Sequence, residues 1–226
     1  ARLGACGAAP VTVKNPNGQA ITRTDLFKYV GSDLAFSPAK IFDAATTAQA
    51  NLIATALVTG DFNGDHQEDI AVALDDGGAN HYVSVFLNSG GGVFGNPKPF
   101  PVGNGPTALV TGDFNGDGLD DIAAPDPSNG RVVVALATGA GAFAAAVPYP
   151  AGTTPQSAAA VDLNGDGALD LVAGSYGSNK IHVFLNRKQG DGALREAGSY
   201  AVADSPIWIV SGDVNRDGKA DLVVTS

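Results

Sequence analysis

The sequence predicts an all-β fold made of about four repeats, each with four short strands. Three observations support this prediction: 30 glycines in 226 residues, short apolar runs separated by turn residues, and a ten-residue segment that recurs unchanged. Many glycine-rich turns between short apolar runs are typical of all-β chains. The Ala-rich stretch 41–57 is the longest helix candidate, but it has β-branched residues and no clean apolar stripe, so we interpret it as mostly non-helical.

The repeat is the strongest signal in the chain. Residues 56–65 read ALVTGDFNGD, and the same ten letters return at 108–117. Looser copies occupy 158–166 (AAAVDLNGD) and 208–217 (WIVSGDVNRD), so the copies lie 49 to 52 residues apart. The four polar segments begin at Asp61, Asp113, Asp162 and Asp213. Self-similarity at such a period is the sequence signature of a repeat architecture.

Each repeat shows the same order of elements. A first apolar strand such as TALVTG (107–112) leads into an Asp-rich loop, and a second short strand follows, as in 121–124. A third apolar run comes next, such as IHVFLN at 181–186, and a glycine-rich turn leads to a fourth segment such as AFAAAVPY at 142–149. Four short strands in a unit of about 50 residues are the pattern of a β-propeller blade. The short connections favour antiparallel pairing.

The two ends of the chain predict how a ring would close. Residues 24–42 resemble the third and fourth strands of a blade, whereas 207–226 supply only the first and second. Joined, the two halves would form one blade and leave no open strand edge. The sequence therefore predicts a β-propeller of about four four-stranded blades over 24–226, preceded by a separate segment, 1–23. Three arrangements stay open: a closed ring of four blades, two chains that share a larger ring, and part of a longer propeller.

Each Asp-rich loop predicts a calcium site. The second loop, 113–121, places oxygen-bearing side chains at positions one, three, five and nine, a glycine at position six and a backbone carbonyl at position seven. Alternating oxygen ligands in a tight turn suit Ca²⁺, a hard cation with six to eight oxygen ligands, better than Mg²⁺, which keeps several waters. The predicted ligands are Asp61, Asn63, Asp65, Gln67, Asp69, Asp113, Asn115, Asp117, Leu119, Asp121, Asp162, Asn164, Asp166, Ala168, Asp170, Asp213, Asn215, Asp217, Lys219 and Asp221.

The loops differ from an EF-hand and from ordinary turns. Position twelve, where an EF-hand needs a bidentate glutamate, is an apolar strand residue such as Ala124. Turn chemistry favours Asp and Asn, but it does not fix acids at positions one, five and nine in four copies. The first loop has His66 at the glycine position, and the fourth has Arg216 beside Asn215, so the second and third loops are the strongest predicted sites and the first is the weakest. About four Ca²⁺ ions are expected to stabilise the fold.

The repeat resembles the FG-GAP/VCBS family, which occurs in the propellers of integrin α-subunits and in many bacterial surface proteins. The resemblance rests on the four D-x-N-x-D-x-x-x-D loops and on flanking strands that end in Thr-Gly or Ser-Gly, and it covers about residues 24–226. It implies a β-propeller with calcium between strands one and two of each blade, and a secreted or cell-surface location. The chain departs from the integrin pattern in its asparagine at position three and in having too few repeats for a seven-blade ring.

Composition narrows the range of partners. The formal net charge of −10 argues against nucleic acid and against anionic membrane surfaces. No apolar segment approaches the roughly 20 residues that a membrane-spanning helix needs. The single cysteine, Cys6, excludes an internal disulfide, and we interpret it as a free thiol near the terminus.

The sequence also leads us to expect no catalytic site. His66, His81 and His182 occupy different repeat positions and form no array, and Cys6 lies outside the repeats. An active site would need a nucleophile with a base, or a metal with an open position and an acid or base nearby. We therefore expect that the chain is not an enzyme.

Two roles remain open for such a chain. The first is an adhesion or assembly module of an extracellular structure, which binds a protein partner or associates with itself; segment 1–23, with its strand-like residues 11–13, could add a strand to a neighbour's sheet. The alternative is a lectin-like propeller that binds a glycan between its blades, with aromatic rings as platforms. The candidate rings are Trp208, Tyr82, Tyr149, Tyr176 and Tyr200. Packing between blades would explain them too, and they do not recur at one repeat position.

Overall fold

The computed structural model of the chain describes residues 7–8, 11–14, 20–23, 28–29, 53–75 and 81–226. The chain divides into two units, Ala1–Phe42 and Asp43–Ser226. In the first unit, β1 (Gly7–Ala8) pairs with β4 (Lys28–Tyr29), and β2 (Val11–Lys14) pairs with β3 (Ala20–Arg23), both antiparallel. The strand expected at 11–13 lies within β2.

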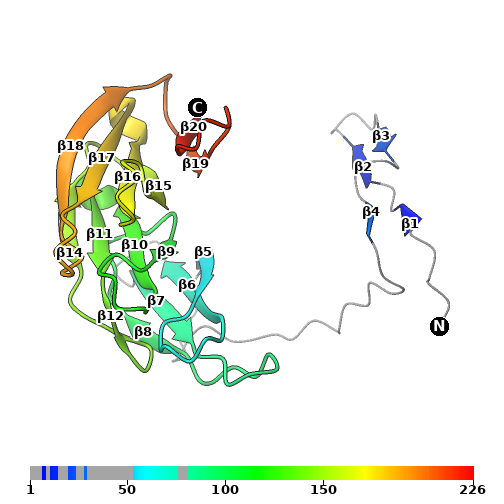
Figure 1. Cartoon of the computed structure of the whole chain (residues 1–226), viewed down its shortest axis with the longest axis vertical. Helices are drawn as coiled ribbons and strands as arrows, with labels where there is room; N and C mark the ends of the chain where they lie inside the picture. Colours follow the sequence, from blue (N-terminus) through cyan, green and yellow to red (C-terminus); the bar gives the residue numbers. More distant parts are fainter. Residues whose placement is uncertain (1–6, 9–10, 15–19, 24–27, 30–52, 76–80) are drawn as a thin grey trace. The chain divides into compact units, whose positions relative to one another are not determined.

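The second unit consists of antiparallel sheets that follow one another along the chain (Figure 1). The first sheet contains β5 (Ile53–Gly60), β6 (Asp69–Asp75), β7 (His81–Phe86) and β8 (Lys98–Phe100). The second contains β9 (Val110–Gly112), β10 (Asp121–Asp126), β11 (Arg131–Ala135) and β14 (Val147–Pro150). The third contains β15 (Pro155–Val161), β16 (Asp170–Ser175), β17 (Lys180–Asn186) and β18 (Leu194–Ala201). A two-stranded sheet of β19 (Trp208–Gly212) and β20 (Asp221–Thr225) ends the chain.

These sheets confirm the all-β prediction and the four-strand order of each complete repeat. Within the repeats, the predicted third and fourth segments pair as neighbours, β7 with β8, β11 with β14 and β17 with β18. Smaller elements fill the connections. They are the hairpin of β12 (Ala137–Gly139) with β13 (Ala142–Phe143), and two 3₁₀ turns, η1 (Pro127–Asn129) and η2 (Tyr176–Ser178).

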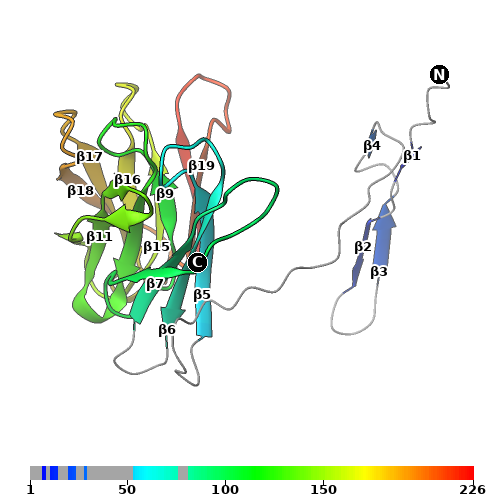
Figure 2. The ribbon, with the colours of Figure 1, turned by 90° about the horizontal axis from the view of Figure 1, so that it is seen from below.

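The first two strands of every repeat pair in the same register. The residue that precedes each leading aspartate lies opposite the ninth loop residue: Gly60 opposite Asp69, Gly112 opposite Asp121, Val161 opposite Asp170 and Gly212 opposite Asp221. Because the register is constant, the four Asp-rich loops emerge at the same end of their sheets (Figure 2).

The core lies between successive sheets. Ala71 and Ala73 of β6 pack with Ile122 and Ala124 of β10 between the first and second sheets. On the opposite face of β10, Ala123 packs with the third sheet. Successive residues of a strand point to opposite faces, so each second strand contributes to two cores. This arrangement explains why the second strands are apolar runs without alternation of polar residues.

The first strands of the repeats are neighbours in space. β5 contacts β9, β9 contacts β15, and β15 contacts β19. A hydrogen bond from the Thr111 hydroxyl to the Thr59 carbonyl joins β9 to β5 at 3.1 Å. Figure 1 shows the result, in which the sheets form an arc with β5, β9 and β15 toward its inner side and β8, β14 and β18 toward its outer side.

The predicted ring closure stays a prediction. Residues 24–27 and 30–52 lie outside the described part of the chain, and of 24–42 only Lys28–Tyr29 is described, as β4 paired with β1. In the described residues β20 pairs with β19 alone. Likewise, of the Ala-rich stretch 41–57 the structure describes 53–57, which belong to β5. No helix among the described residues is long and apolar enough to cross a membrane.

Candidate metal centre

The leading aspartate of each loop organises the turn through backbone hydrogen bonds. In the second loop, Oδ1 of Asp113 accepts the N–H of Gly116 at 2.6 Å and of Asp117 at 3.1 Å, and Oδ2 accepts the N–H of Gly118 at 2.8 Å. The first and third loops repeat these contacts around Asp61 and Asp162. Side-chain to backbone bonds of this kind are the reason that Asp favours turns.

Positions three and five continue the same pattern. Oδ1 of Asn115 accepts the N–H of Asp117 at 3.0 Å, and Oδ1 of Asp117 accepts the N–H of Leu119 at 2.9 Å. The amide of Asn115 also donates to the second oxygen of Asp117 at 2.9 Å. The oxygens at one, three and five therefore lie along one short turn, in the first, third and fourth loops as well.

The turn requires left-handed backbone at positions four and six. Gly116 and Gly118 adopt φ of 77° and 86°, a region that glycine reaches without a steric penalty. The first loop places His66 there with φ of 61°, and the fourth places Arg216 there with φ of 64°. Side chains are uncommon in this region. The two loops with a predicted irregularity therefore carry the expected backbone strain.

The ninth-position aspartates are anchors between the loop and the sheet. Asp69, Asp121 and Asp170 are fully buried. In the second loop, Oδ2 of Asp121 accepts the N–H of Phe114 at 2.9 Å, and Oδ1 accepts the N–H of Ala137 at 2.7 Å, just after the third strand. Asp69 and Asp170 make equivalent contacts. Replacement of this aspartate by alanine would leave two buried N–H groups without an acceptor.

Burial dominates the electrostatics of these anchors. It raises the pKa of Asp121 to about 6, against the lowering effect of the two backbone N–H groups, and the nearby charges of Asp117 and Asp113 raise it further. Burial also raises the pKa of Asp69 and Asp170. In contrast, the backbone N–H groups, led by Gly167, lower the pKa of Asp162 at position one. In the third loop, the carboxylate at position one therefore ionises at a lower pH than the carboxylate at position nine.

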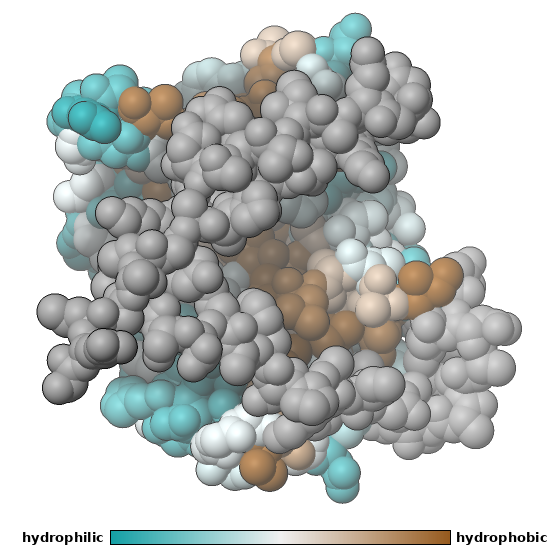
Figure 3. Space-filling view, turned by 90° about the vertical axis from the view of Figure 1, so that its right-hand side faces the viewer, coloured by the Kyte–Doolittle hydropathy of each residue, from teal (hydrophilic) through white to brown (hydrophobic). Residues whose placement is uncertain are grey.

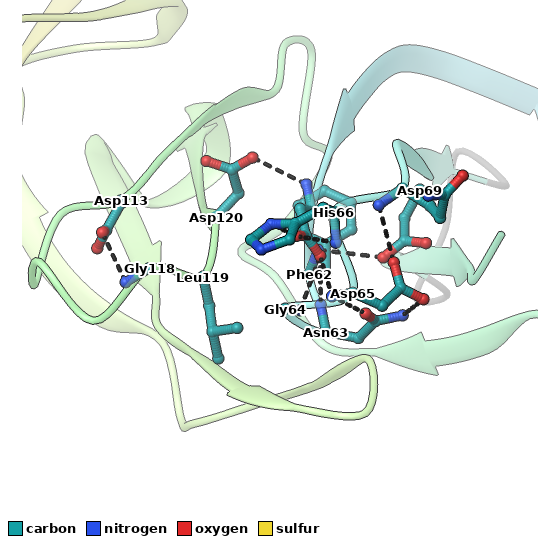
Figure 4. Close-up of polar contacts among 12 residues, drawn as sticks. Phe62, Asn63, Gly64, Asp65, His66, Asp69, Asp113, Gly118, Leu119 and Asp120 are labelled. Atoms are coloured by element: carbon teal, nitrogen blue, oxygen red, sulfur yellow. Dashed lines mark hydrogen bonds and ion pairs between the residues drawn. The ribbon is translucent and has the colours of Figure 1, made fainter. Parts of the chain in front are cut away.

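Asp120 makes a contact between loops that the sequence reasoning missed. Its Oδ2 accepts the N–H of Asp61 in the preceding loop at 2.9 Å, while its own N–H donates to the Asp61 carbonyl at 2.9 Å (Figure 4). The second loop is thereby fixed to the first. The signal was the adjacent acid pair Asp120-Asp121, in which only the second acid belongs to the repeated pattern.

Contacts between the second and third loops follow a different design. The Asn186 amide donates to the Phe114 carbonyl at 2.7 Å and to the Leu169 carbonyl at 3.1 Å, which joins β17 to both loops. Asn115 and Gly116 line a pocket with Gly167, Ala168 and Lys188 between these loops. The Lys188 ammonium donates to the backbone carbonyl of Asp166.

The residues of the loops fit a calcium ion in their chemistry. Carboxylate and amide oxygens at positions one, three and five, with the carbonyl at seven, form the all-oxygen donor set that Ca²⁺ prefers. Positions one and nine both use their two carboxylate oxygens for backbone N–H groups, but only the ninth aspartate is fully buried. Among the described residues, no three or more His, Cys, Asp or Glu side chains are gathered as a metal-binding group. The calcium assignment of the twenty residues stays a prediction.

The histidines lie in separate places, as expected. His81 pairs with Asp75 at 3.0 Å at one end of the first sheet, and His182 pairs with Glu196 at 3.2 Å in the third. His66 lies 3.5 Å from Asp61 in the first loop, on the exposed turn. Cys6 lies outside the described residues.

The candidate aromatic rings fall into two groups. Tyr149 is partly buried, packs against Phe184 with ring centroids 5.9 Å apart, and its hydroxyl accepts the Leu194 N–H at 3.2 Å. Tyr82 is partly buried against a small cluster of the first sheet. The other three rings are exposed: Tyr176 at 41%, Tyr200 at 56% and Trp208 at 60%.

The fold and the loops define a tandem-repeat protein of antiparallel four-stranded sheets, joined through their second strands and through their Asp-rich loops. The chain belongs to the FG-GAP-like repeat family, whose model matches three overlapping stretches, 61–124, 113–173 and 162–224. Each stretch runs from one leading aspartate to the second strand of the next repeat. The predicted family is therefore confirmed. No protein of curated function is detectably similar in sequence.

Solved structures share the fold at low sequence identity. The rhamnogalacturonan lyase PL11 of Bacillus licheniformis is 17% identical, with a TM-score of 0.52 over 96% of this chain and 43% of the lyase. The rhamnogalacturonan lyase YesW is 16% identical, with a TM-score of 0.51 over 98% of this chain and 44% of the lyase. This chain thus spans less than half the length of these proteins. The likeness establishes a common fold.

The comparison corrects the expectation that the chain is not an enzyme. That expectation depended on the dispersed histidines and on the position of Cys6 outside the repeats. Proteins described as rhamnogalacturonan lyases, among them the exo-type YesX, share the fold over nearly the whole of this chain. A repeat scaffold of this kind therefore does not exclude catalysis, and the dispersed histidines are no argument against it.

Proposed function

We propose that this chain is a calcium-stabilised, propeller-type module of about four blades that serves adhesion or assembly outside the cell or at its surface. The observation that carries the proposal is the common geometry of the four loops. In each, the oxygens of positions one, three and five line one exposed turn, and backbone N–H groups hold them there. Calcium in these turns would neutralise clustered carboxylates and cross-link the start of the loop to its end.

A calcium titration tests this proposal. We expect the full chain, stripped of metal, to bind about four Ca²⁺ ions in isothermal titration calorimetry. We also expect the melting temperature to rise with free calcium, because an ion that binds only the folded state stabilises it by mass action. A melting temperature that is the same in millimolar calcium and in excess chelator would contradict the proposal. Magnesium at equal concentration is the control, and it is expected to give a smaller shift.

A carbohydrate-binding role is the second candidate. Tyr176 and Tyr200 are exposed and lie at the same end of the third sheet, where β16 and β18 finish, opposite the Asp-rich loops. Exposed rings of this kind offer flat apolar surfaces with a polar edge. The solved structures that share the fold are described as rhamnogalacturonan lyases, so fragments of that polysaccharide belong among the ligands tested.

The two candidates are separated by a glycan array that includes these fragments, run in calcium and in chelator, with a parallel assay for cleavage. Saturable binding that is lost in Tyr176→Ala and Tyr200→Ala, and kept in the partly buried Tyr82→Phe control, would support the second candidate. Absence of binding by the folded chain would leave the adhesion or assembly role.

A further inference from the structure

Three of the four Asp-rich loops contain an asparagine that is followed directly by glycine. These pairs occupy loop positions three and four: Asn63-Gly64, Asn115-Gly116 and Asn164-Gly165. In such a pair the backbone nitrogen of the glycine can attack the side-chain amide carbon of the asparagine and form a five-membered succinimide ring. Glycine favours this attack because it has no Cβ to obstruct the approach. Whether a loop reacts therefore depends on how its fold holds these two groups.

The reaction is a deamidation, and water is its only co-reactant. The glycine nitrogen gives up its proton as it bonds to the amide carbon, and the side-chain nitrogen leaves as ammonia. Water then opens the ring at one of its two carbonyl groups, which gives aspartate or isoaspartate. In isoaspartate the main chain continues through the side-chain carbon. Water has access to all three pairs, because Gly64, Gly116 and Gly165 are exposed.

The leading aspartate of each loop holds the attacking nitrogen. Its Oδ1 accepts the N–H of Gly64 at 2.7 Å, of Gly116 at 2.6 Å and of Gly165 at 2.8 Å. A nitrogen that donates to a carboxylate loses its proton less readily, because the resulting anion would lie beside a negative charge. This hydrogen bond therefore opposes the first step of the reaction.

The asparagine side chain is held as well. Oδ1 of Asn115 accepts the Asp117 N–H at 3.0 Å, and the Asn115 amide donates to Oδ2 of Asp117 at 2.9 Å. Asn63 makes the same two bonds with Asp65, at 2.8 Å and 3.1 Å. To form the ring, the side chain would have to turn toward the backbone and give up these bonds. In the folded loop, both reacting groups are therefore fixed by other partners.

Packing by itself would not prevent the reaction in the second and third loops. A Cβ built on Gly116 or on Gly165 would meet nothing within 4 Å, so the space beside these glycines is open. At Gly64, by contrast, the Leu119 side chain lies 3.0 Å from the position of a Cβ. In the view of Figure 3, hydrophilic side chains lie toward the margins of the molecule and apolar ones gather across its middle. The polar loops thus depend for protection on their hydrogen bonds more than on a core.

The fourth loop differs at both reacting groups. Its asparagine, Asn215, is followed by Arg216, whose side chain obstructs the attack and which has a left-handed φ of 64°. The loop is described throughout, and Asp213 accepts the N–H of Asp217 at 3.0 Å and of Gly218 at 2.9 Å, but not that of Arg216. The bond from position four to the leading aspartate is thus present in the three loops that have a reactive glycine and absent from the loop that lacks one.

We propose that Asn63, Asn115 and Asn164 are latent deamidation sites, which the leading aspartate keeps unreactive while the loop is folded. Opening of a loop releases both groups, and the product opposes return to the same turn. Aspartate at position three adds a negative charge beside the carboxylates of positions one and five, and isoaspartate adds a backbone atom to the turn. The modification would mark each loop that has been open. It goes beyond the proposed calcium role, and the bonds that oppose it lie within the chain itself.

Peptide mapping by mass spectrometry tests the proposal on the full chain, incubated at mildly alkaline pH with and without urea. In urea we expect the asparagines of the first three loops to react at similar rates, and Asn215 to react much more slowly. Arg216→Gly should raise Asn215 to the rate of the others. In the folded chain we expect the first three to react at least about tenfold more slowly, because a hydrogen bond to a charged group must first break. Equal rates in the folded chain and in urea would overturn the proposal.

A reciprocal pair of variants tests the role of the leading aspartate. In the folded chain, Asp113→Ala is expected to raise the deamidation rate of Asn115 about tenfold and to leave that of Asn164 unchanged. Asp162→Ala is expected to do the reverse. Each loop is thereby the control for the other in the same sample. An unchanged rate at the asparagine of the altered loop overturns the assignment.

Asn129 reports any wider loosening of the second repeat. It precedes Gly130 outside the loop, and its amide donates to both oxygens of Asp126, at 2.9 Å and 3.0 Å. A second variant, Asp113→Asn, keeps an acceptor oxygen but removes the charge, and it should raise the rate of Asn115 by a smaller factor with no rise at Asn129. Equal rises at Asn115 and Asn129 in both variants would overturn the assignment. Because rates are compared between residues of one sample, failure here is distinct from failure of the calcium titration.

Discussion

At the scale of single residues, position nine of the loops shows how one side chain can serve both a turn and a sheet. Asp121 is fully buried, and each of its oxygens accepts a different backbone N–H, one at the start of the loop and one beyond the third strand. Burial raises the pKa of the same side chain to about 6. Geometry therefore requires the aspartate, while burial makes its charge unfavourable.

This conflict predicts an unusual pH dependence for the metal-free chain. Because the folded-state pKa of Asp121 is raised to about 6 from 3.8, the folded state binds more protons than the unfolded state between these values. Stability should therefore rise as the pH falls from 7 to 5. Thermal melts in chelator would measure this. Asp121→Asn, which is neutral throughout, should show a smaller rise, and Asp191→Asn on an exposed turn should behave as the wild type. A melting temperature that falls steadily from pH 7 to pH 5 would contradict the assignment.

The glycines that precede the leading aspartates predict a position-specific cost for adding one methyl group. Gly60→Ala would bring a Cβ to 2.8 Å from the Asp120 carboxylate, so we expect the free energy of unfolding to fall by about 1–3 kcal/mol. Gly212→Ala has no such neighbour, and we expect a change within about 0.5 kcal/mol. Urea unfolding of the two variants at low protein concentration compares them directly. Equal losses would show that the close contact between Gly60 and Asp120 does not contribute to stability.

At the scale of the loop, backbone strain and calcium binding are expected to vary together. The second loop has glycine at both left-handed positions, whereas the first has His66 at one of them with φ of 61°. A loop that holds its turn without strain should bind the ion more tightly. We therefore expect Asp113→Ala with Asp117→Ala to lower the melting temperature in calcium more than Asp61→Ala with Asp65→Ala.

The comparison needs both pairs in calcium and in chelator. Each pair removes turn hydrogen bonds as well as ligands, so the loss that remains in chelator is subtracted from the loss in calcium. A difference of 1 kcal/mol corresponds to roughly 2–4 °C for a domain of this size. Equal calcium-dependent losses in the two loops would contradict the ranking.

Much of the element structure could be predicted from the sequence. The repeat period and the unchanged segment around Asp61 and Asp113 led directly to four strands per unit, because identical local sequences in tandem favour identical local folds. The loop turn was predictable too, since Asp, Asn and Gly have known backbone preferences. The anchoring role of Asp121 was not, because a carboxylate in an Asp-rich loop reads equally well as a ligand. Its partner beyond the third strand is 16 residues away.

Contacts between repeats were the least predictable part of the site. Asp120 differs from the repeat consensus, and nothing local shows that it reaches the Asp61 backbone, 59 residues earlier. Such a contact depends on how two sheets pack. The sequence interpretation also excluded catalysis because the histidines are dispersed. This exclusion was wrong, because solved structures described as lyases share the fold at low sequence identity.

At the scale of the whole molecule, stability should be greatest in the middle of the arc. β10 and β16 are buried along their full length between two neighbours, while β20 has partly buried or exposed residues throughout. In hydrogen exchange under conditions that keep the chain monomeric, we expect β10 and β16 amides to exchange slowest and β20 amides fastest. Equal protection of β20 and β16 in the monomer would show that some other element covers the last sheet.

The side chain at position eight of one loop lies over the residue that precedes the leading aspartate of the loop before it, as Asp120 does over Gly60 and Leu169 over Gly112. The matched sizes of these residues also bear on how such a chain can change in evolution. A family of tandem repeats is expected to gain and lose units by recombination, and the constant strand register permits this. The loops of this chain restrict it. Loss of the third repeat would place Ala220 over Gly112 and leave the space of Leu169 empty. An exchange of the second and third repeats would bring Leu169 over Gly60, where Asp120 now accepts a hydrogen bond from the Asp61 N–H. The repeats share one fold, yet each is adapted to its own place in the order.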